Sequence, residues 1–262
     1  MSRYSATLYS LFSVFSILVP LLLRAVSVFR YPVGALSYIF YALVVLGLVL
    51  LAVDTFRKKY TPAFQGPYGK GLGVFSALMS VALLAEFVTA VVRVYEAASE
   101  SGWRLYTVLD TLEALAAFFA MLYFAFVSLT FRGRRYDFQS LFLLHLSPVL
   151  WAVLKTLGIM EQSSDVKGDV NSILGQLVLV MMLCFFYCFA QEVYRKKGAM
   201  AGTVFFARAL AYCAMLFVFD ELILLLARED KPLSEGFLLA VTAAVLCGFS
   251  YLFEKNIYLE SE

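Results

Sequence analysis

The second apolar stretch of the chain, residues 33–59, reads VGALSYIFYALVVLGLVLLAVDTFRKK. It carries no charge before Asp54, and the bases Arg57, Lys58 and Lys59 come directly after its apolar part. About 20 apolar residues are enough for a helix to cross the hydrocarbon core of a bilayer, and short loops rich in Lys and Arg stay on the cytoplasmic side. This stretch therefore predicts a membrane-spanning helix whose C-terminal end faces the cytoplasm.

Seven more stretches of this kind lie between loops marked by Gly, Pro and charge. Together they predict eight spans, at residues 7–29, 33–56, 71–95, 105–131, 138–158, 169–194, 203–228 and 233–253. Hydrophobic residues make up 62% of the 262 residues and charged residues only 15%, and the mean hydropathy is +0.83. Because a water-soluble domain cannot carry that much apolar surface, we expect an all-α integral membrane protein that lies in a lipid bilayer.

The composition also excludes several classes of protein. A net charge of +2 argues against nucleic-acid binding, and four Cys are too few for a disulfide-stapled secreted module. No HExxH, GxSxG, CxxC or Gly-rich phosphate loop occurs, and the single histidine, His145, has no partner at metal spacing. We expect no metal and no cofactor, a His145 ring that is satisfied in the core or faces a pore, and cysteines that act as small apolar fillers.

The charge of the loops alternates along the chain. Bases follow the second, fourth and sixth spans: Arg57, Lys58, Lys59, Lys70, Arg132, Arg134, Arg135, Arg195, Lys196 and Lys197. The other loops are mainly acidic: Glu96, Glu100, Glu161, Asp165, Asp169, Glu229, Asp230 and Glu235. This pattern predicts that the N- and C-termini are both cytoplasmic. No Asn-x-Ser/Thr acceptor and no long loop occurs, which is typical of a multi-pass protein of the bacterial cytoplasmic membrane.

The two halves of the sequence resemble each other. Residues 54–59, DTFRKK, match residues 192–197, EVYRKK, acid for acid, ring for ring and base for base. An acid and a base seven residues apart occur in both the third and the seventh span: Glu86 with Arg93, and Glu221 with Arg228. The pattern predicts a tandem duplication of a four-helix unit, residues 1–136 and 137–262, related by an axis along the membrane normal because four spans is an even number.

Ionisable side chains inside membrane spans call for an explanation, because each costs several kcal/mol of free energy unless it is paired with an opposite charge or hydrated. Nine occur, and the predicted topology places all of them in the outer half of the membrane: Arg24, Glu86, Arg93, Asp110, Glu113, Lys155, Asp220, Glu221 and Arg228. We expect an outward-facing cavity of mixed charge whose ligand-binding residues are Glu86, Asp110, Glu113, Asp220, Glu221, Arg24, Arg93 and Arg228. Arg93, Lys155 and Arg228 lie close enough to the interface to snorkel instead.

Adjacent acids in the seventh span cannot share one cavity. Asp220 and Glu221 diverge by ~100° around a helix, so one can pair with a neighbouring span while the other faces the cavity.

Three functions remain open from the sequence. The first is binding and transport of a polar or zwitterionic small molecule. The second is a membrane sensor or a partner subunit of a larger complex, as a homo- or hetero-oligomer. The third is an intramembrane lipid-acting hydrolase that uses carboxylates. An acid pair alone is a weak catalytic signal, so the sequence leans away from an enzyme and leaves catalytic residues unassigned.

Overall fold

The computed structural model describes residues 3–29, 34–58, 60–62, 70–101, 105–131, 142–163, 170–195, 200–227 and 235–260. These residues form eight helices and two short strands: α1 (Arg3–Phe29), α2 (Gly34–Phe56), β1 (Tyr60–Pro62), α3 (Lys70–Ser101), α4 (Leu105–Phe131), α5 (Phe142–Ser163), α6 (Val170–Arg195), α7 (Met200–Ala227), α8 (Glu235–Ile257) and β2 (Tyr258–Glu260).

Six of the described helices, α2, α3, α4, α6, α7 and α8, are long and apolar enough to cross a membrane. The apolar parts of α1 and α5 are shorter, Phe15–Phe29 and Leu144–Met160, and these are the two helices that contain a proline, Pro20 and Pro148. The described chain is thus helical, as the sequence predicts, with helices of the length and composition of membrane spans, and its apolar helices point to contact with a lipid bilayer. That all eight helices cross the membrane stays a prediction.

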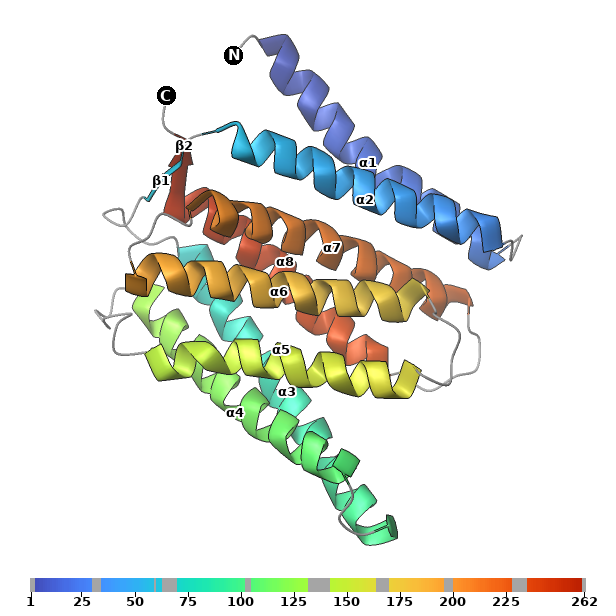
Figure 1. The fold of residues 1–262 in the computed structure, drawn as a ribbon, viewed down its shortest axis with the longest axis vertical. Helices are drawn as coiled ribbons and strands as arrows, with labels where there is room; N and C mark the ends of the chain where they lie inside the picture. The colour runs from blue at the N-terminus through green and yellow to red at the C-terminus, as the bar shows by residue number, and fades with distance from the viewer. Residues whose placement is uncertain are drawn as a thin grey trace.

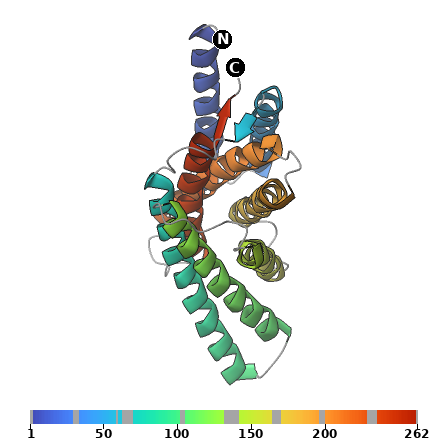
Figure 2. The same ribbon diagram turned by 90° about the vertical axis from the view of Figure 1, so that its left-hand side faces the viewer.

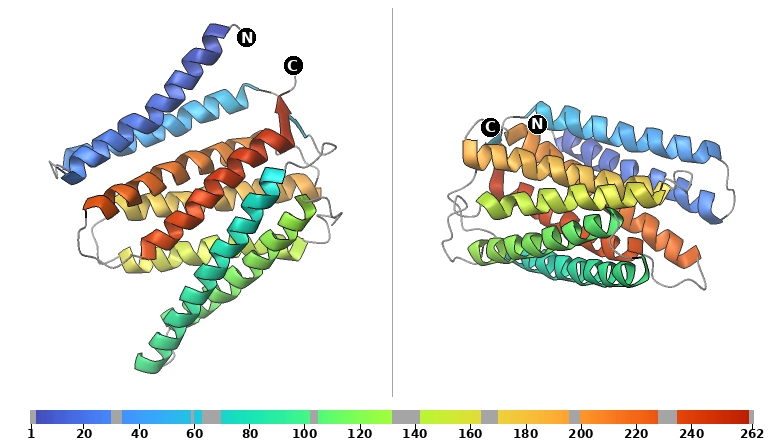
Figure 3. Two further views of the ribbon diagram at one scale, coloured as in Figure 1. Left: turned by 180° about the vertical axis from the view of Figure 1, so that it is seen from behind. Right: turned by 60° about the horizontal axis from the view of Figure 1, so that its bottom comes forward.

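The helices pack in two layers. In Figure 1, α2, α7, α6 and α5 lie side by side, and Figure 2 shows α1, α8, α3 and α4 in a second layer that crosses them. The view from behind in Figure 3 shows α8 and α3 converging toward the end of the bundle that holds β1 and β2. We call this end the sheet end, and the other end the far end.

Contacts between neighbouring helices close α3 to α8 into a ring. Each of these helices packs on the next along the chain, and α8 returns to α3. The hairpin of α1 and α2 lies outside this ring and packs mainly on α7. The ring is therefore one body to which α7 attaches the N-terminal hairpin.

Aromatic side chains fill the ring toward the sheet end. Phe124 of α4, Phe186 of α6 and Phe249 of α8 are buried, and Phe124 packs edge-on against both of the others, with ring centroids 5.7 and 5.6 Å apart. Phe185 and Phe253 extend the stack with centroids 5.1 Å apart. Edge-to-face aromatic packing leaves few voids, and these side chains belong to the buried core of the ring.

His145 belongs to the same packed region. Its ring is 1% exposed and lies 2.8 Å (Nδ1) from the Tyr123 hydroxyl and 3.0 Å (Nε2) from the Phe186 carbonyl oxygen. The prediction of a satisfied imidazole is confirmed, and all four cysteines are free thiols.

α3 and α8 touch at the sheet end and separate toward the far end. Gly248 of α8 lies so close to α3 that a Cβ there would overlap the Phe75 ring, and a Cβ on Gly71 would be 3.0 Å from Leu252. Gly248 ends a run of small residues, with Ala240 and Ala244, whose spacing predicts close helix approach. Farther along the two helices a groove lies between α3 and the start of α8.

The two strands are the one departure from an all-helical chain among the described residues. β1 pairs antiparallel with β2, with Tyr60 opposite Glu260 and Pro62 opposite Tyr258. Neither strand has an apolar run that predicts it. Both are short extensions of the chain after a helix, and they meet at the same end of the bundle. The sheet ties the segment after α2 to the end of α8.

Candidate functional site

The charged residues of α3, α4 and α5 meet inside the ring. Lys155 of α5 donates from Nζ to Glu86 Oε2 of α3 at 3.0 Å and to Glu113 Oε1 of α4 at 3.2 Å. Glu86 is 1% exposed, Glu113 3% and Lys155 8%. Taking a charge out of water costs several kcal/mol, which is offset only by close pairing. One ammonium here serves two buried carboxylates.

Arg93 extends this cluster toward the far end. It donates from Nη2 to Glu113 Oε1 at 2.9 Å, and its Nη1 lies 3.9 Å from Asp110 Oδ1. The side chains of Arg93 and Asp110 are 23% and 24% exposed, against 4% for Glu113. The five residues Glu86, Arg93, Asp110, Glu113 and Lys155, called the charged cluster below, thus run from a buried end at Glu86 to a more open end at Asp110.

Local helix geometry brings the cluster together. Glu86 and Arg93 lie nearly two turns apart on one face of α3, and Asp110 and Glu113 lie one turn apart on α4. On α5, Gly158 lies one turn after Lys155 and faces the same carboxylate, since a Cβ on this glycine would be 3.7 Å from Glu113 Oε2, an ordinary contact. Three helices that are adjacent in the ring therefore present their charges to one point.

A groove of about 720 Å³ opens beside the buried end of the charged cluster. Its walls are α3 and the start of α8, and Glu86, Arg93 and Lys155 line it together with Thr89. The other lining residues are apolar: Val81, Leu84, Ala85, Val88, Val92, Phe237 and Leu238. This volume is in the range of small-molecule sites, which are mostly apolar with a few polar groups.

The two carboxylate oxygens of Glu86 differ in their hydrogen bonding. Its Oε2 accepts from Lys155, whereas Oε1 is buried and has no hydrogen-bond partner among the residues that the structure describes. Buried polar atoms nearly always have a partner, and each exception needs an explanation. A ligand in the groove would supply one.

A second ion pair attaches α1 to α7. Arg24 donates from Nε to Asp220 Oδ1 at 2.6 Å, with side chains 10% and 1% exposed. The prediction that one of the two adjacent acids pairs with a neighbouring span is confirmed for Asp220. This pair lies on the other side of α7 from the ring interior, so Arg24 and Asp220 are not part of the charged cluster.

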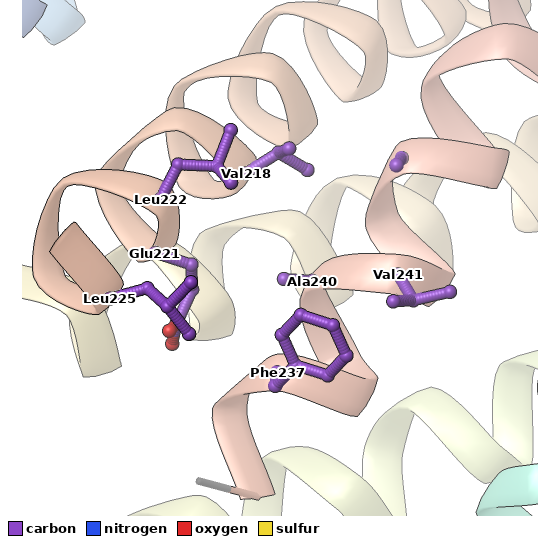
Figure 4. A pocket seen from close by; sticks show the side chains of 8 residues that line it. Val218, Glu221, Leu222, Leu225, Phe237, Ala240 and Val241 are labelled. Atoms are coloured by element: carbon purple, nitrogen blue, oxygen red, sulfur yellow. The ribbon is translucent and has the colours of Figure 1, made fainter. Parts of the chain in front are cut away.

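Glu221 lies in a separate, small pocket. Figure 4 shows its side chain between α7 and α8, near Leu225 and Phe237. The pocket measures about 150 Å³ and is otherwise apolar. Phe237 lines both this pocket and the larger groove, so it stands between Glu221 and the charged cluster. Arg228, the base seven residues after Glu221 in the seventh span, lies outside the described residues.

Four of the eight predicted ligand-binding residues thus come together: Glu86, Arg93, Asp110 and Glu113. Lys155 is not among the predicted ligand-binding residues, because it lies near a predicted membrane interface where a lysine can snorkel. Instead of extending outward, it bonds to two acids. The signal that could have found it is its depth: the apolar part of α5 is short, Leu144–Met160, and an ionisable residue within it needs a partner as much as Glu86 does.

A third polar contact joins α2 to α7 at the sheet end. Arg208 donates from Nη1 to Asp54 Oδ2 at 2.9 Å and to Thr55 Oγ1 at 3.2 Å, and Lys58 lies 3.3 Å from the same Asp54 oxygen. This arrangement agrees with the placement of Asp54 beside its basic cluster. Within the described part of the chain, no group of three His, Cys, Asp or Glu side chains is arranged to hold a metal ion.

No protein-family model matches the chain, and no curated protein or solved structure matches it either.

Proposed function

We propose that this chain is a transporter that binds a polar or zwitterionic small molecule in the groove beside Glu86. One observation carries the proposal: a buried network of acids and bases borders a groove of about 720 Å³ and leaves Glu86 Oε1 without a partner among the described residues. A surface with both signs of charge suits a ligand with both signs better than a simple anion or cation.

The packed aromatic half of the ring supports a transport cycle. The charged cluster lies in the half that loop charge assigns to the outside, and the aromatic stack around Phe124 and Phe186 packs the half that loop charge assigns to the cytoplasm. Access from one side alone is what alternating-access transport requires of each of its two states. In this proposal the structure corresponds to the outward-facing state, with both termini in the cytoplasm of a bacterium.

In this proposal residues 1–136 and 137–262 are a duplication at the level of the sequence, although α1 and α2 lie outside the ring that includes their counterparts α5 and α6. In this duplication Glu86 of α3 corresponds to Glu221 of α7, and both acids flank α8. Only the first of them borders the larger groove. The duplication then supplies the scaffold, and one half has taken over ligand binding.

Flux measurements test the proposal. The purified protein is reconstituted in liposomes, and entry of radiolabelled amino acids, betaines and polyamines is compared between wild type, Glu86→Gln and the control Glu96→Gln. Glu96 is an exposed acid near the end of α3, so the control makes the same chemical change away from the groove.

The expected result is entry of one solute class that Glu86→Gln reduces tenfold or more and Glu96→Gln leaves unchanged. If solutes stabilise the wild type against heat in a Glu86-dependent manner but none enters the vesicles, the protein is a sensor instead. If neither binding nor flux depends on Glu86, the carboxylate is structural and the proposal is wrong.

A further inference from the structure

The groove beside Glu86 opens sideways, toward the space that lipid would occupy. Its α3 wall consists of residues on the outer face of that helix: Val81 is 64% exposed, Val88 51% and Val92 47%. On the facing helix, Phe237 is 38% exposed. In a bilayer, side chains exposed on this face meet acyl chains and not water. The groove thus connects the buried carboxylate directly to the hydrocarbon region.

The position of Glu86 on α3 makes this connection. Glu86 is rotated by about 120 to 160° from Val81, Val88 and Val92, since each residue turns an α-helix by ~100°. The lining therefore changes around the helix, from apolar at the open side to charged where α3 faces α5. A molecule lying in the groove has an apolar environment along most of its length and a carboxylate at its inner edge.

The chemistry at that inner edge calls for a hydrogen-bond donor with positive charge. Glu86 Oε1 is an acceptor without a partner among the described residues, and the one ammonium within reach, on Lys155, is shared with Glu113. Hydrogen bonds from a charged donor to a carboxylate are about twice as strong as neutral ones. A primary ammonium supplies three N–H donors, whereas a quaternary ammonium supplies none.

From these observations we infer that the ligand is a single-chain amphiphile with a primary ammonium headgroup. Its hydrocarbon chain lies between α3 and the start of α8, and its ammonium donates to Glu86 Oε1. It enters from the membrane between these two helices. This inference rests on the proposed function: it keeps the site beside Glu86 but replaces the polar or zwitterionic solute with a cationic amphiphile, because the open acceptor at the inner edge is a carboxylate oxygen and the bases Arg93 and Lys155 are already bonded to acids.

Binding of three matched amines tests the inference. Dodecylammonium carries the chain and the N–H donors, dodecyltrimethylammonium keeps the chain and the charge without the donors, and propylammonium keeps the donors without the chain. Each is titrated, below its critical micelle concentration, into nanodiscs that contain the protein, with empty nanodiscs as the blank for partitioning into lipid.

Four proteins are compared: wild type, Glu86→Gln, Ala85→Trp and Ala42→Trp. Ala85 lines the groove and is exposed, so an indole there fills the space for the chain. Ala42 is an exposed alanine on α2, away from the groove, and controls for an added tryptophan.

Wild type is expected to bind dodecylammonium at least tenfold more tightly than either of the other amines. Glu86→Gln should remove the preference for dodecylammonium over dodecyltrimethylammonium, and Ala85→Trp should weaken both long-chain amines tenfold while Ala42→Trp has no effect. Ala85→Trp keeps the test valid if Glu86→Gln does not fold.

Two results overturn the inference in distinguishable ways. If propylammonium binds as tightly as dodecylammonium and its binding depends on Glu86, the hydrocarbon chain of the ligand contributes nothing to binding and the inference is wrong. The proposed binding of polar solutes then stands. If no amine distinguishes wild type from a folded Glu86→Gln protein, and flux of polar solutes is equally unaffected, the inference and the proposed function both fail.

Discussion

Removing the lysine at the centre of the charged cluster gives the sharpest prediction for stability. Lys155→Met keeps the length and apolar stem of the side chain but removes the ammonium that serves two carboxylates. Glu113 still has Arg93 at 2.9 Å, so the carboxylate left without a base is Glu86, which is 1% exposed. Breaking a buried ion pair by removing one partner costs about 3–5 kcal/mol, and we expect Lys155→Met to lower the free energy of unfolding by that amount.

A second substitution tests whether the unpaired Glu86 carboxylate causes the loss of stability in Lys155→Met. In Lys155→Met combined with Glu86→Gln, no charge is left stranded at this position, and the remaining cost should fall to the ~1–3 kcal/mol of an unsatisfied polar group. The free energy of unfolding is measured for both proteins and for each single variant in mixed micelles, with dodecyl sulfate as the denaturant. The two substitutions should therefore show a coupling of about 2 kcal/mol.

Lys58→Met serves as the matched control. Lys58 pairs with Asp54 at 3.3 Å, but its side chain is 22% exposed and Asp54 keeps Arg208 as a partner. Partly exposed pairs of this kind contribute about 0–1 kcal/mol. If Lys155→Met costs no more than Lys58→Met, or if the effects of Lys155→Met and Glu86→Gln simply add, the reasoning about a buried shared ammonium is refuted.

Two further predictions concern the attachment of the N-terminal hairpin to α7. Arg24→Met should cost about 3–5 kcal/mol because it removes the base bonded at 2.6 Å to the buried Asp220 carboxylate, and adding Asp220→Asn should recover part of this in the same unfolding assay; equal stability of Arg24→Met and wild type would contradict the pairing. Gly47→Ala should cost about 1–3 kcal/mol because its Cβ would overlap the Tyr212 hydroxyl, whereas Gly158→Ala meets only ordinary contacts and should change stability by at most about 1 kcal/mol. A loss for Gly158→Ala as large as that for Gly47→Ala would contradict the packing argument, because alanine is the better helix former at both positions and, of the two, only Gly47 has a close neighbour.

The helices could be predicted from the sequence because the apolar runs that mark them are a local feature of the chain. Each apolar run ends at a loop with charge, Gly or Pro, and the helix bounds agree with the predicted spans at most ends to within a few residues. The largest differences lie at α3, which continues to Ser101, and at α5, which runs from Phe142 to Ser163. Polar residues at a helix end continue the backbone hydrogen bonds outside the apolar core, so hydropathy alone does not mark the end.

The partners of the buried charges could not be read in the same way. Helical spacing correctly placed Asp110 and Glu113 on one face, but which helix faces them depends on packing between elements far apart in the chain. Lys155 meets Glu86 over 69 residues of sequence separation. A single sequence contains no record of such contacts, so the nine intramembrane charges looked like one set, although Arg24 and Asp220 form a pair of their own.

Native mass spectrometry of the protein released from mild detergent tests directly whether the groove beside Glu86 holds an amphiphilic ligand. Wild type should then retain one co-purified amine-headed amphiphile per chain, Glu86→Gln should lose it, and Glu96→Gln should retain it. If wild type and Glu86→Gln carry the same adducts, or if wild type carries none even after incubation with dodecylammonium, the claim is contradicted.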